Sequence, residues 1–281
     1  MSMPNCRTPG TGALFSMALL NRVAMREDRF TLPECSPHLT ERYCELESVV
    51  TSLNRYYENA VWRSYGSEVR ASGLLQTVSL HDERIATHPR ISYRAPSLAT
   101  FQERLCSEPV LVERWEQFLD WQVNPEWAIE MGSKLLGEVA QFRNNEIVKP
   151  RMGHVAGWKY INVENSRLWH PELKNVRARR SFPPLLEAVI LYAVFVIFHP
   201  LKEGNGRVAR AIFHGNLANR GVISAPFLPL GPMIYHYGNS FTPAFRGMAQ
   251  DGRWEEFLQF MLDLIELCCQ FTALERGISE L

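Results

Sequence analysis

Apolar residues recur at three- and four-residue steps over most of the chain, which is the spacing of one face of an α-helix. From Thr40 to about Val61 this pattern predicts one long helix, with Thr40 as the residue that caps its start. A second helical region begins near Leu98, and a third runs from Pro125 to about Phe142. The pattern therefore predicts a mainly α fold.

The segment between Arg143 and Pro184 departs from this pattern, because Val, Trp, Tyr and Ile stand there among Gly and Asn. Such a composition favours a short β-hairpin or an extended loop over a helix. The longest apolar run follows, from Leu185 to Phe198, and only Glu187 interrupts it. Because this run is shorter than the ~18 residues typical of a membrane span, we expect a buried helix.

Three more helices are expected after this run. The first is closed by Gly221 in a left-handed conformation. The second runs from about Met233 to Gln250 with a break near Pro243, and the third runs from Trp254 to about Glu275 with one apolar face. The whole pattern suggests a loosely ordered lead-in, an N-terminal helical region and a core domain, at residues 1–36, 37–125 and 126–275.

Composition narrows the class of partner. Thirty basic and thirty acidic residues give a formal net charge of zero, so no global field attracts nucleic acid or an anionic membrane, and neither is expected as a partner. The six cysteines form no CxxC pair and no Cys/His spacing suited to zinc. This usage favours a reduced, cytoplasmic protein.

The apolar run is followed by HPLKEGNGRVAR, residues 199–210. Gly204 and Gly206 can adopt positive φ and, with Asn205 between them, turn backbone N–H groups toward one point, which makes an anion nest. The helix that starts here would direct its positive N-terminal end into the same space. Arg207 and Arg210 are one turn apart and would grip successive phosphates. The segment therefore predicts a polyphosphate site.

Two further side chains of the motif add chemistry. Glu203 beside phosphates predicts a Mg²⁺ ligand, because Mg²⁺ keeps most of its waters and binds one carboxylate together with the phosphates. His199 has a pKa suited to taking a proton near neutral pH, so we assign it as the general base. A simple turn or a solvated arginine face would explain each feature alone, but their combination favours phosphoryl-centred chemistry.

This motif resembles that of the Fic (Fic/Doc) family, HPFx(D/E)GNGRxxR, and departs from it only where Leu201 replaces the usual Phe. The resemblance implies a helical Fic core with a small β-hairpin flap, and the transfer of AMP from Mg-ATP to a hydroxyl of a target protein with release of pyrophosphate. It also implies that His199 deprotonates the hydroxyl, Glu203 holds magnesium and Arg210 orients the γ-phosphate. The α- and β-phosphates would contact Gly204, Asn205, Gly206 and Arg207.

The resemblance extends to a target-binding flap. Residues Met152 to Trp169 fall where the family has a β-hairpin that pairs with an extended stretch of target backbone, which is recognition by strand addition. We expect the pairing edge at Tyr160, Ile161 and Asn162. An ordinary surface hairpin is the alternative interpretation.

A second family feature is a glutamate in a helix bearing (S/T)xxxE(G/N), which pairs with the second motif arginine and blocks placement of the γ-phosphate. The nearest match is the stretch from Asn54 to Asn59, where Asn stands in the first position instead of Ser or Thr. Glu58 is therefore the candidate inhibitor, and an exposed helix carboxylate is the alternative. Ser64 to Val69, with Glu68, is a rival stretch that fails at its last position.

These observations lead us to predict a cytoplasmic protein adenylyltransferase (an AMPylator) of the Fic type, which uses ATP and Mg²⁺ to modify a Ser, Thr or Tyr hydroxyl and is autoinhibited from its N-terminal region. Removal of AMP, or transfer of another nucleotide or phosphate-linked group, stays open as an alternative. A nucleotide-responsive interaction module is a further alternative, although pure binding would not need His199. Self-modification and homo-oligomerisation are left open.

Overall fold

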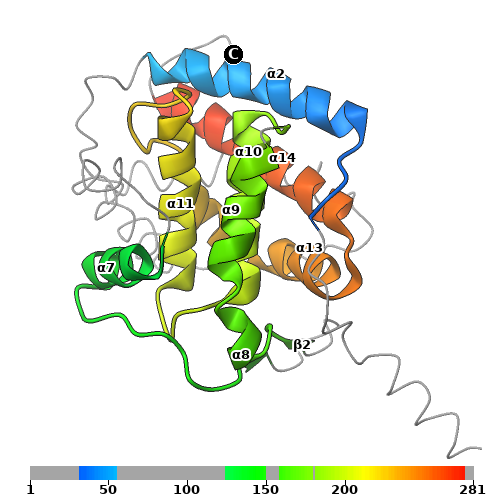
Figure 1. Cartoon of the computed structure of the whole chain (residues 1–281). Helices are drawn as coiled ribbons and strands as arrows, with labels where there is room; N and C mark the ends of the chain where they lie inside the picture. The colour runs from blue at the N-terminus through cyan, green and yellow to red at the C-terminus, as the bar shows by residue number, and fades with distance from the viewer. Residues whose placement is uncertain (1–31, 56–123, 150–157, 180, 276–281) are drawn as a thin grey trace, which may run out of the picture. The chain divides into compact units, whose positions relative to one another are not determined.

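The computed structural model describes residues 32–55, 124–149, 158–179 and 181–275 of the 281-residue chain (Figure 1). The chain divides after Leu32, and the elements below belong to the part that starts at Pro33. Helices make up most of the described residues, together with one short antiparallel strand pair. The predicted mainly α fold is confirmed, whereas the domain boundaries at residues 36 and 125 stay predictions.

The apolar run forms the central helix α10 (Pro184–Phe198), in which every residue from 185 to 198 is buried. It contacts α9 (Trp169–Arg179), α11 (Asn205–Asn219) and α2 (Pro37–Asn54). A helix that is apolar on all sides is stable in water only when neighbours cover it, because each large apolar side chain gains ~1.5–3 kcal/mol on full burial. The prediction of a buried helix is confirmed.

Helix α2 starts at Pro37 instead of at the predicted Thr40 cap. Ser36 is the actual N-cap, because its Oγ accepts from the N–H of Leu39 at 3.3 Å and Pro37 needs no donor partner in the first turn. Thr40 lies inside the helix, where its Oγ1 donates to the Ser36 carbonyl at 3.0 Å. The helix ends at Asn54, and residues 56–61 of the predicted helix lie outside the described residues.

Several polar contacts fix α2 on the rest of the protein. The Tyr43 hydroxyl donates to the Leu258 carbonyl at 2.8 Å, and Glu47 Oε2 accepts from the N–H of Leu185 at 2.8 Å, which caps the start of α10. At the end of α2, Asn54 Oδ1 accepts from the backbone and side chain of Ser224 at 2.8 and 3.0 Å. Figure 1 shows α2 lying across one end of α10 and α11.

Helix α7 (Pro125–Leu136) ends earlier than the predicted Phe142. Gly137 adopts φ 78°, and its N–H donates to the Ser133 carbonyl at 2.9 Å, which closes the helix with a left-handed residue. The chain then runs beside the segment that follows α10, since Phe142 and Leu201 form an antiparallel β-bridge. The amide of Lys202 donates to the Gln141 carbonyl at 2.9 Å, which extends this pairing.

The segment between Arg143 and Pro184 holds the predicted strands, but it is not a hairpin or loop throughout. Strands β1 (Val148–Lys149) and β2 (Trp158–Lys159) are antiparallel, with Val148 opposite Lys159. From Val163 onward the prediction is wrong, because α8 (Val163–Ser166) and α9 follow. Asn162 caps α8, and α9 buries the helically spaced side chains of Trp169, Leu173 and Val176.

The predicted break near Pro243 is also wrong. Helix α12 (Leu230–His236) ends before Tyr237, and α13 (Gly238–Asp251) runs through Pro243. Tyr237 takes φ −92° and ψ 24°, and its buried side chain anchors the change of direction. Pro243 lies in the second turn of α13, where it removes one helical hydrogen bond without ending the helix.

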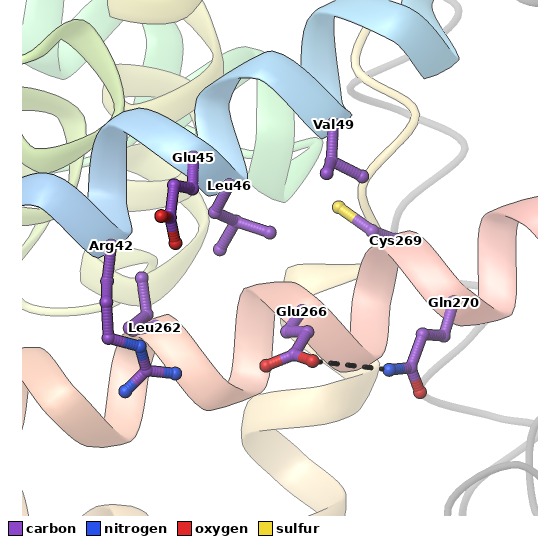
Figure 2. A pocket seen from close by; sticks show the side chains of 8 residues that line it. All are labelled: Arg42, Glu45, Leu46, Val49, Leu262, Glu266, Cys269 and Gln270. Carbon is purple, nitrogen blue, oxygen red and sulfur yellow. Dashed lines mark hydrogen bonds between the residues drawn. The ribbon is translucent and has the colours of Figure 1, made fainter. Parts of the chain in front are cut away.

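The last helix, α14 (Trp254–Glu275), has the predicted bounds. A groove of about 290 Å³ lies between α2 and α14, with apolar side chains such as Leu46 and Leu262 beside charged ones such as Arg42 and Glu266 (Figure 2). Within the described ranges, no helix combines the length and the apolarity that crossing a bilayer would need.

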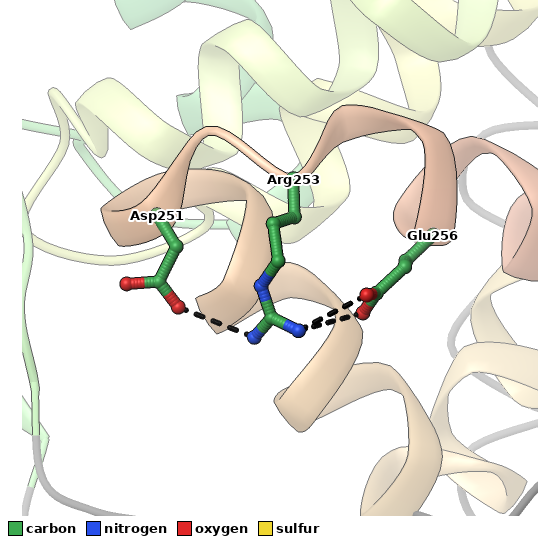
Figure 3. Close-up of polar contacts among 3 residues, drawn as sticks. All are labelled: Asp251, Arg253 and Glu256. Carbon is green, nitrogen blue, oxygen red and sulfur yellow. Dashed lines mark hydrogen bonds and ion pairs between the residues drawn. The ribbon is translucent and has the colours of Figure 1, made fainter.

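One arginine, Arg253, makes ion pairs on both sides of the turn between α13 and α14 (Figure 3). Gly252 adopts φ 68°, and the amide of the next residue, Arg253, donates to the Gly247 carbonyl at 3.1 Å. The Arg253 guanidinium contacts Glu256 at 2.9 Å and Asp251 at 3.2 Å. Exposed ion pairs of this kind contribute little stability individually, so the turn geometry carries most of this connection.

Candidate functional site

His199 forms the C-cap of α10 in a left-handed conformation, with φ 47° and ψ 56°. It is the one non-glycine residue with positive φ in the described part of the chain. This conformation costs an L-amino acid roughly 1–2 kcal/mol, so the surrounding contacts must hold it. The backbone N–H of His199 still donates to the Phe195 carbonyl at 3.0 Å, which places the residue directly at the end of the buried helix.

The imidazole of His199 is half-buried and has a defined orientation. Its Nδ1 lies 3.3 Å from the Val196 carbonyl oxygen, and the ring of Tyr160 stacks on it with a centroid distance of 4.1 Å and an interplanar angle of 27°. A carbonyl oxygen can only accept, so this contact favours the tautomer that carries its proton on Nδ1. In that tautomer Nε2 is the nitrogen that can take a proton.

The loop between α10 and α11 is tied together by a side chain of the motif itself. Asn205 is buried, its Oδ1 accepts from the amide of Leu201 at 2.9 Å, and its Nδ2 donates to the Leu201 carbonyl at 2.7 Å. Leu201, which departs from the family motif, is also fully buried, as expected for an apolar substitute. The Asn205 side chain therefore braces the loop, which leaves its backbone N–H for the predicted contact with phosphate.

The two glycines of the motif differ in conformation. Gly204 is the N-cap of α11 with φ 80°, and an added Cβ would lie 3.0 Å from Leu136 Cδ1. Gly206 lies in the first turn of α11 and has ordinary helical geometry, so the expectation of positive φ there is wrong. Helix α11 begins at Asn205, because the left-handed turn is completed at Gly204 alone.

The start of α11 faces the loop with backbone donors. Its first intrahelical hydrogen bond runs from the N–H of Val208 to the Gly204 carbonyl at 3.0 Å, so helical geometry leaves the N–H groups of Asn205, Gly206 and Arg207 without a helical partner. The helix dipole adds a partial positive charge at the same end. This combination is suited to binding an anion such as phosphate.

The two motif arginines contact backbone carbonyls. Arg207 Nη1 donates to the Leu135 carbonyl at the end of α7 at 2.9 Å, and Arg210 Nη1 donates to the Gly206 carbonyl at 3.0 Å. A guanidinium has five N–H donors, so each arginine can hold its carbonyl and bind an anion as well. The predicted partner Glu58 lies outside the described residues, as does the rival Glu68.

Glu203 is exposed on the loop directly before the start of α11. Among the described residues, no three His, Cys, Asp or Glu side chains gather closely enough to form a metal site. Glu203 alone nevertheless fits a Mg²⁺ ion that arrives with a nucleotide, because one carboxylate, several waters and the phosphate oxygens would complete its octahedral shell. The binding of Mg²⁺ by Glu203 stays a prediction.

The three predicted flap residues follow β2 directly and are not part of either strand. The amide of Tyr160 donates to the Ile147 carbonyl at 3.1 Å, and Asn162 Oδ1 accepts from Asn165. Burial raises the pKa of Tyr160 to about 12, although the charge of Arg143 acts in the opposite direction. Tyr160 is therefore neutral at neutral pH, and pairing of Tyr160, Ile161 and Asn162 with a target backbone stays a prediction.

Sequence reasoning gave no role to Arg143, yet the structure places it beside His199. It is only 4% exposed, its amide donates to the Pro200 carbonyl at 2.9 Å and its Nη2 donates to the Phe198 carbonyl at 3.2 Å. No local pattern marks this arginine, because Phe198 and Pro200, its partners on either side of His199, lie more than fifty residues further along the chain. Only the tertiary fold brings them together.

Comparisons with known proteins agree with this geometry. A family model described as Fic/DOC family matches residues 122–217, a range that includes the whole 199–210 motif. A Fic family protein from Desulfovibrio desulfuricans G20 has a similar structure, with a TM-score of 0.50 and 14% identity over 98% of this chain and 78% of that one. This likeness supports the Fic helical fold alone.

A Fic domain-containing signaling protein from Bacteroides thetaiotaomicron VPI-5482 was also matched, with a TM-score of 0.44 and 14% identity over 87% of this chain and 98% of that one.

Proposed function

We propose that this chain, of which residues 122–217 match a family model described as Fic/DOC family, transfers AMP from Mg-ATP to a Ser, Thr or Tyr hydroxyl of a target protein. A Fic-type site in general transfers a nucleotidyl or other phosphate-linked group. The observation that supports the finer proposal is the left-handed conformation of His199, which holds this residue at the end of α10, in the loop that leads to the N-terminus of α11. The proposed base and the proposed anion site thereby belong to one loop.

The proposed reaction uses the two sides of this loop. Nε2 of His199 takes the proton of the target hydroxyl, the hydroxyl oxygen forms a bond to the α-phosphorus of ATP, and the bond from that phosphorus to the bridging oxygen of the β-phosphate breaks. Pyrophosphate leaves with that oxygen and its electron pair. The backbone N–H groups at the start of α11, together with Arg207 and Arg210, offset the negative charge on the phosphates. Bound Mg²⁺ would supply further charge neutralisation, with Glu203 as its protein ligand.

The test is label transfer from a panel of nucleotides. We would incubate the protein with labelled ATP, GTP, CTP or UTP and Mg²⁺, alone and with a cell lysate, and compare His199→Ala with His38→Ala. His38 is an exposed histidine on α2, so its replacement controls for the loss of a histidine outside the site. We expect labelled protein from ATP with the wild type and with His38→Ala, and none with His199→Ala.

Other outcomes of this experiment would overturn the proposal. Label from a different nucleotide would show transfer of another group. In a parallel incubation with protein that already carries AMP, release of AMP would show removal of the group by hydrolysis. Tight binding of nucleotide without any labelled protein, in a preparation with an intact fold, would favour the interaction module.

We also propose that Glu58 inhibits the site by pairing with Arg210. The support is the resemblance of the stretch from Asn54 to Asn59 to the family's inhibitory sequence, and Asn54 itself is held by Ser224. Glu58→Gly should raise self-modification with labelled ATP, whereas Glu68→Gly, in the rival stretch, should not. Unchanged labelling by an active Glu58→Gly preparation would remove Glu58 from this role.

A further inference from the structure

The guanidinium of Arg143 lies at the base of the β1–β2 hairpin and donates to backbone carbonyls of several segments. It donates to the carbonyls of Ile161 and of Asn162, the latter at 3.4 Å, on the segment that follows β2. It also donates to the carbonyls of Asn145 at 3.3 Å and of Phe198 at 3.2 Å. One buried cation therefore joins the base of the hairpin to the last residue of α10.

Arg143 holds the chain on both sides of His199. Its side chain binds the carbonyl of Phe198, directly before His199, and its backbone N–H donates to the carbonyl of Pro200, directly after it, at 2.9 Å. These two contacts restrain the peptides whose rotation would release the left-handed conformation of His199. Hydrogen bonds from a charged donor are stronger than those from a neutral one, so the guanidinium is suited to maintain this strained residue.

Arg143 also reaches the other partner of the imidazole stack. Tyr160 stacks on His199, and its amide is held by the Ile147 carbonyl, while the carbonyl of the next residue, Ile161, accepts from the guanidinium. Further support comes from Glu146, whose Oε1 accepts from the N–H of Val163 at 2.9 Å. The segments that carry the His199 and Tyr160 rings are therefore both hydrogen-bonded to Arg143.

The buried position of Arg143 explains why the residue type matters. Burial lowers the pKa of the guanidinium, while the charge of Glu146, and that of Tyr160 once its phenol ionises, act in the opposite direction. A planar fork of N–H donors can bind carbonyls from several segments at once, whereas a lysine ammonium has three donors on one atom and cannot span them. Lysine at this position would keep the charge and lose the geometry.

We propose that Arg143 is a positioning residue for the base: it acts through the peptides that flank His199 and through Tyr160, and it keeps Nδ1 directed at Val196 and Nε2 directed at the reacting hydroxyl. This inference rests on the proposed role of His199. It assigns Arg143 to catalysis without any contact to substrate. A merely structural arginine would stabilise the fold and leave the imidazole unchanged.

The experiment measures the imidazole directly. Long-range ¹H–¹⁵N NMR spectra of histidine-labelled protein report the tautomer and the titration of His199, with the resonance assigned from His199→Ala. The wild type should show the Nδ1–H tautomer, and Arg143→Lys should show a mixture of tautomers, a shifted imidazole pKa and loss of the ring-current shift from Tyr160. Arg220→Lys is the control. Arg220 lies 3.9 Å from buried Glu187, where α11 ends and α10 begins, and these two helix ends are the ones away from the 199–210 loop.

Kinetics add a second readout. Misplacement of a base by about 1 Å costs on the order of 100-fold in rate, so Arg143→Lys should lower kcat by about that factor, shift its pH profile and leave the KM for ATP within about two-fold. Arg220→Lys should lower the unfolding midpoint and leave the pH profile unchanged. If Arg143→Lys does not fold, Tyr160→Leu tests the stack alone and should give the same mixture of tautomers.

The inference would be overturned if folded Arg143→Lys kept the wild-type tautomer, imidazole pKa and ring-current shift. It would likewise be overturned if Tyr160→Leu kept the wild-type tautomer and imidazole pKa. It would also be overturned if Arg220→Lys changed the His199 resonance equally. The NMR measurement needs no turnover. Failure of the proposed AMP transfer would appear as unlabelled wild-type protein with an unchanged spectrum, and is therefore distinguishable.

Discussion

The motif glycine Gly204 and the helix-closing glycine Gly137 form a matched pair for testing what the loop before α11 requires. Both have positive φ, 80° and 78°, so alanine at either position meets the same backbone strain. They differ in surroundings. An added Cβ at Gly137 would meet nothing within 4 Å, whereas at Gly204 it would lie 3.0, 3.2 and 3.4 Å from the Cδ1, Cγ and Cδ2 atoms of Leu136.

The expected losses of stability follow from two energy terms, the backbone strain at positive φ and the steric contact with Leu136. The left-handed conformation costs alanine roughly 1–2 kcal/mol, and a stiffer unfolded chain offsets ~0.4–1 kcal/mol of this, so Gly137→Ala should lower the free energy of unfolding by about 1 kcal/mol. Gly204→Ala adds overpacking against Leu136, which typically costs ~1–3 kcal/mol. Leu136 is only half-buried and can move partly aside, so we expect a total loss of about 2–3 kcal/mol.

Urea unfolding followed by tryptophan fluorescence measures both losses, provided that the dependence on urea keeps the same slope. Leu136→Ala provides the further control. In that background, Gly204→Ala should cost only about 1 kcal/mol, which gives a coupling energy of about 1–2 kcal/mol between the two positions. Equal losses at Gly137 and Gly204, or an undiminished loss at Gly204 in the Leu136→Ala background, would refute the steric argument.

Three further outcomes are expected. Asn205→Asp keeps the acceptor but loses the donor to the buried Leu201 carbonyl, so the free energy of unfolding in urea should fall by ~1–3 kcal/mol. Asn219→Asp removes a similar donor at an exposed position, and a larger loss there than at Asn205 would contradict this. Burial raises the pKa of Glu47 above its ordinary 4.5, so the native state keeps the carboxyl proton to higher pH than the unfolded chain does. The free energy of unfolding should therefore fall as pH rises from about 4.5 through the pKa of the native state. Glu47→Gln should flatten this dependence of stability on pH, and an unchanged dependence would contradict the reasoning. Burial also raises the pKa of the Cys269 thiol, so alkylation of the native protein, followed by peptide mapping, should modify exposed Cys44 faster than Cys269. Equal rates at these two cysteines would contradict this.

The amino-acid sequence by itself determined the features that depend on neighbours along the chain. The run from Leu185 to Phe198 admits one solution in water, a helix covered on all sides, and the bounds of α14 follow from its periodic apolar face. The motif from His199 to Arg210 likewise depends on neighbours along the chain, because the residues proposed for catalysis and for phosphate binding all lie within twelve positions around one glycine turn and one helix N-terminus.

Tertiary contacts decided the rest. The periodicity of apolar residues predicted that α7 continues to Phe142. In the structure the helix is closed at Gly137, and residues 141–143 pair with the loop after α10. Nothing local indicated that Tyr160 would stack on His199, or that Arg143 would bind the carbonyls around it, since these groups meet only when the hairpin packs on the end of α10. The sequence determines which groups are available for a reaction, and the packing of distant segments decides how the proposed base, His199, is held.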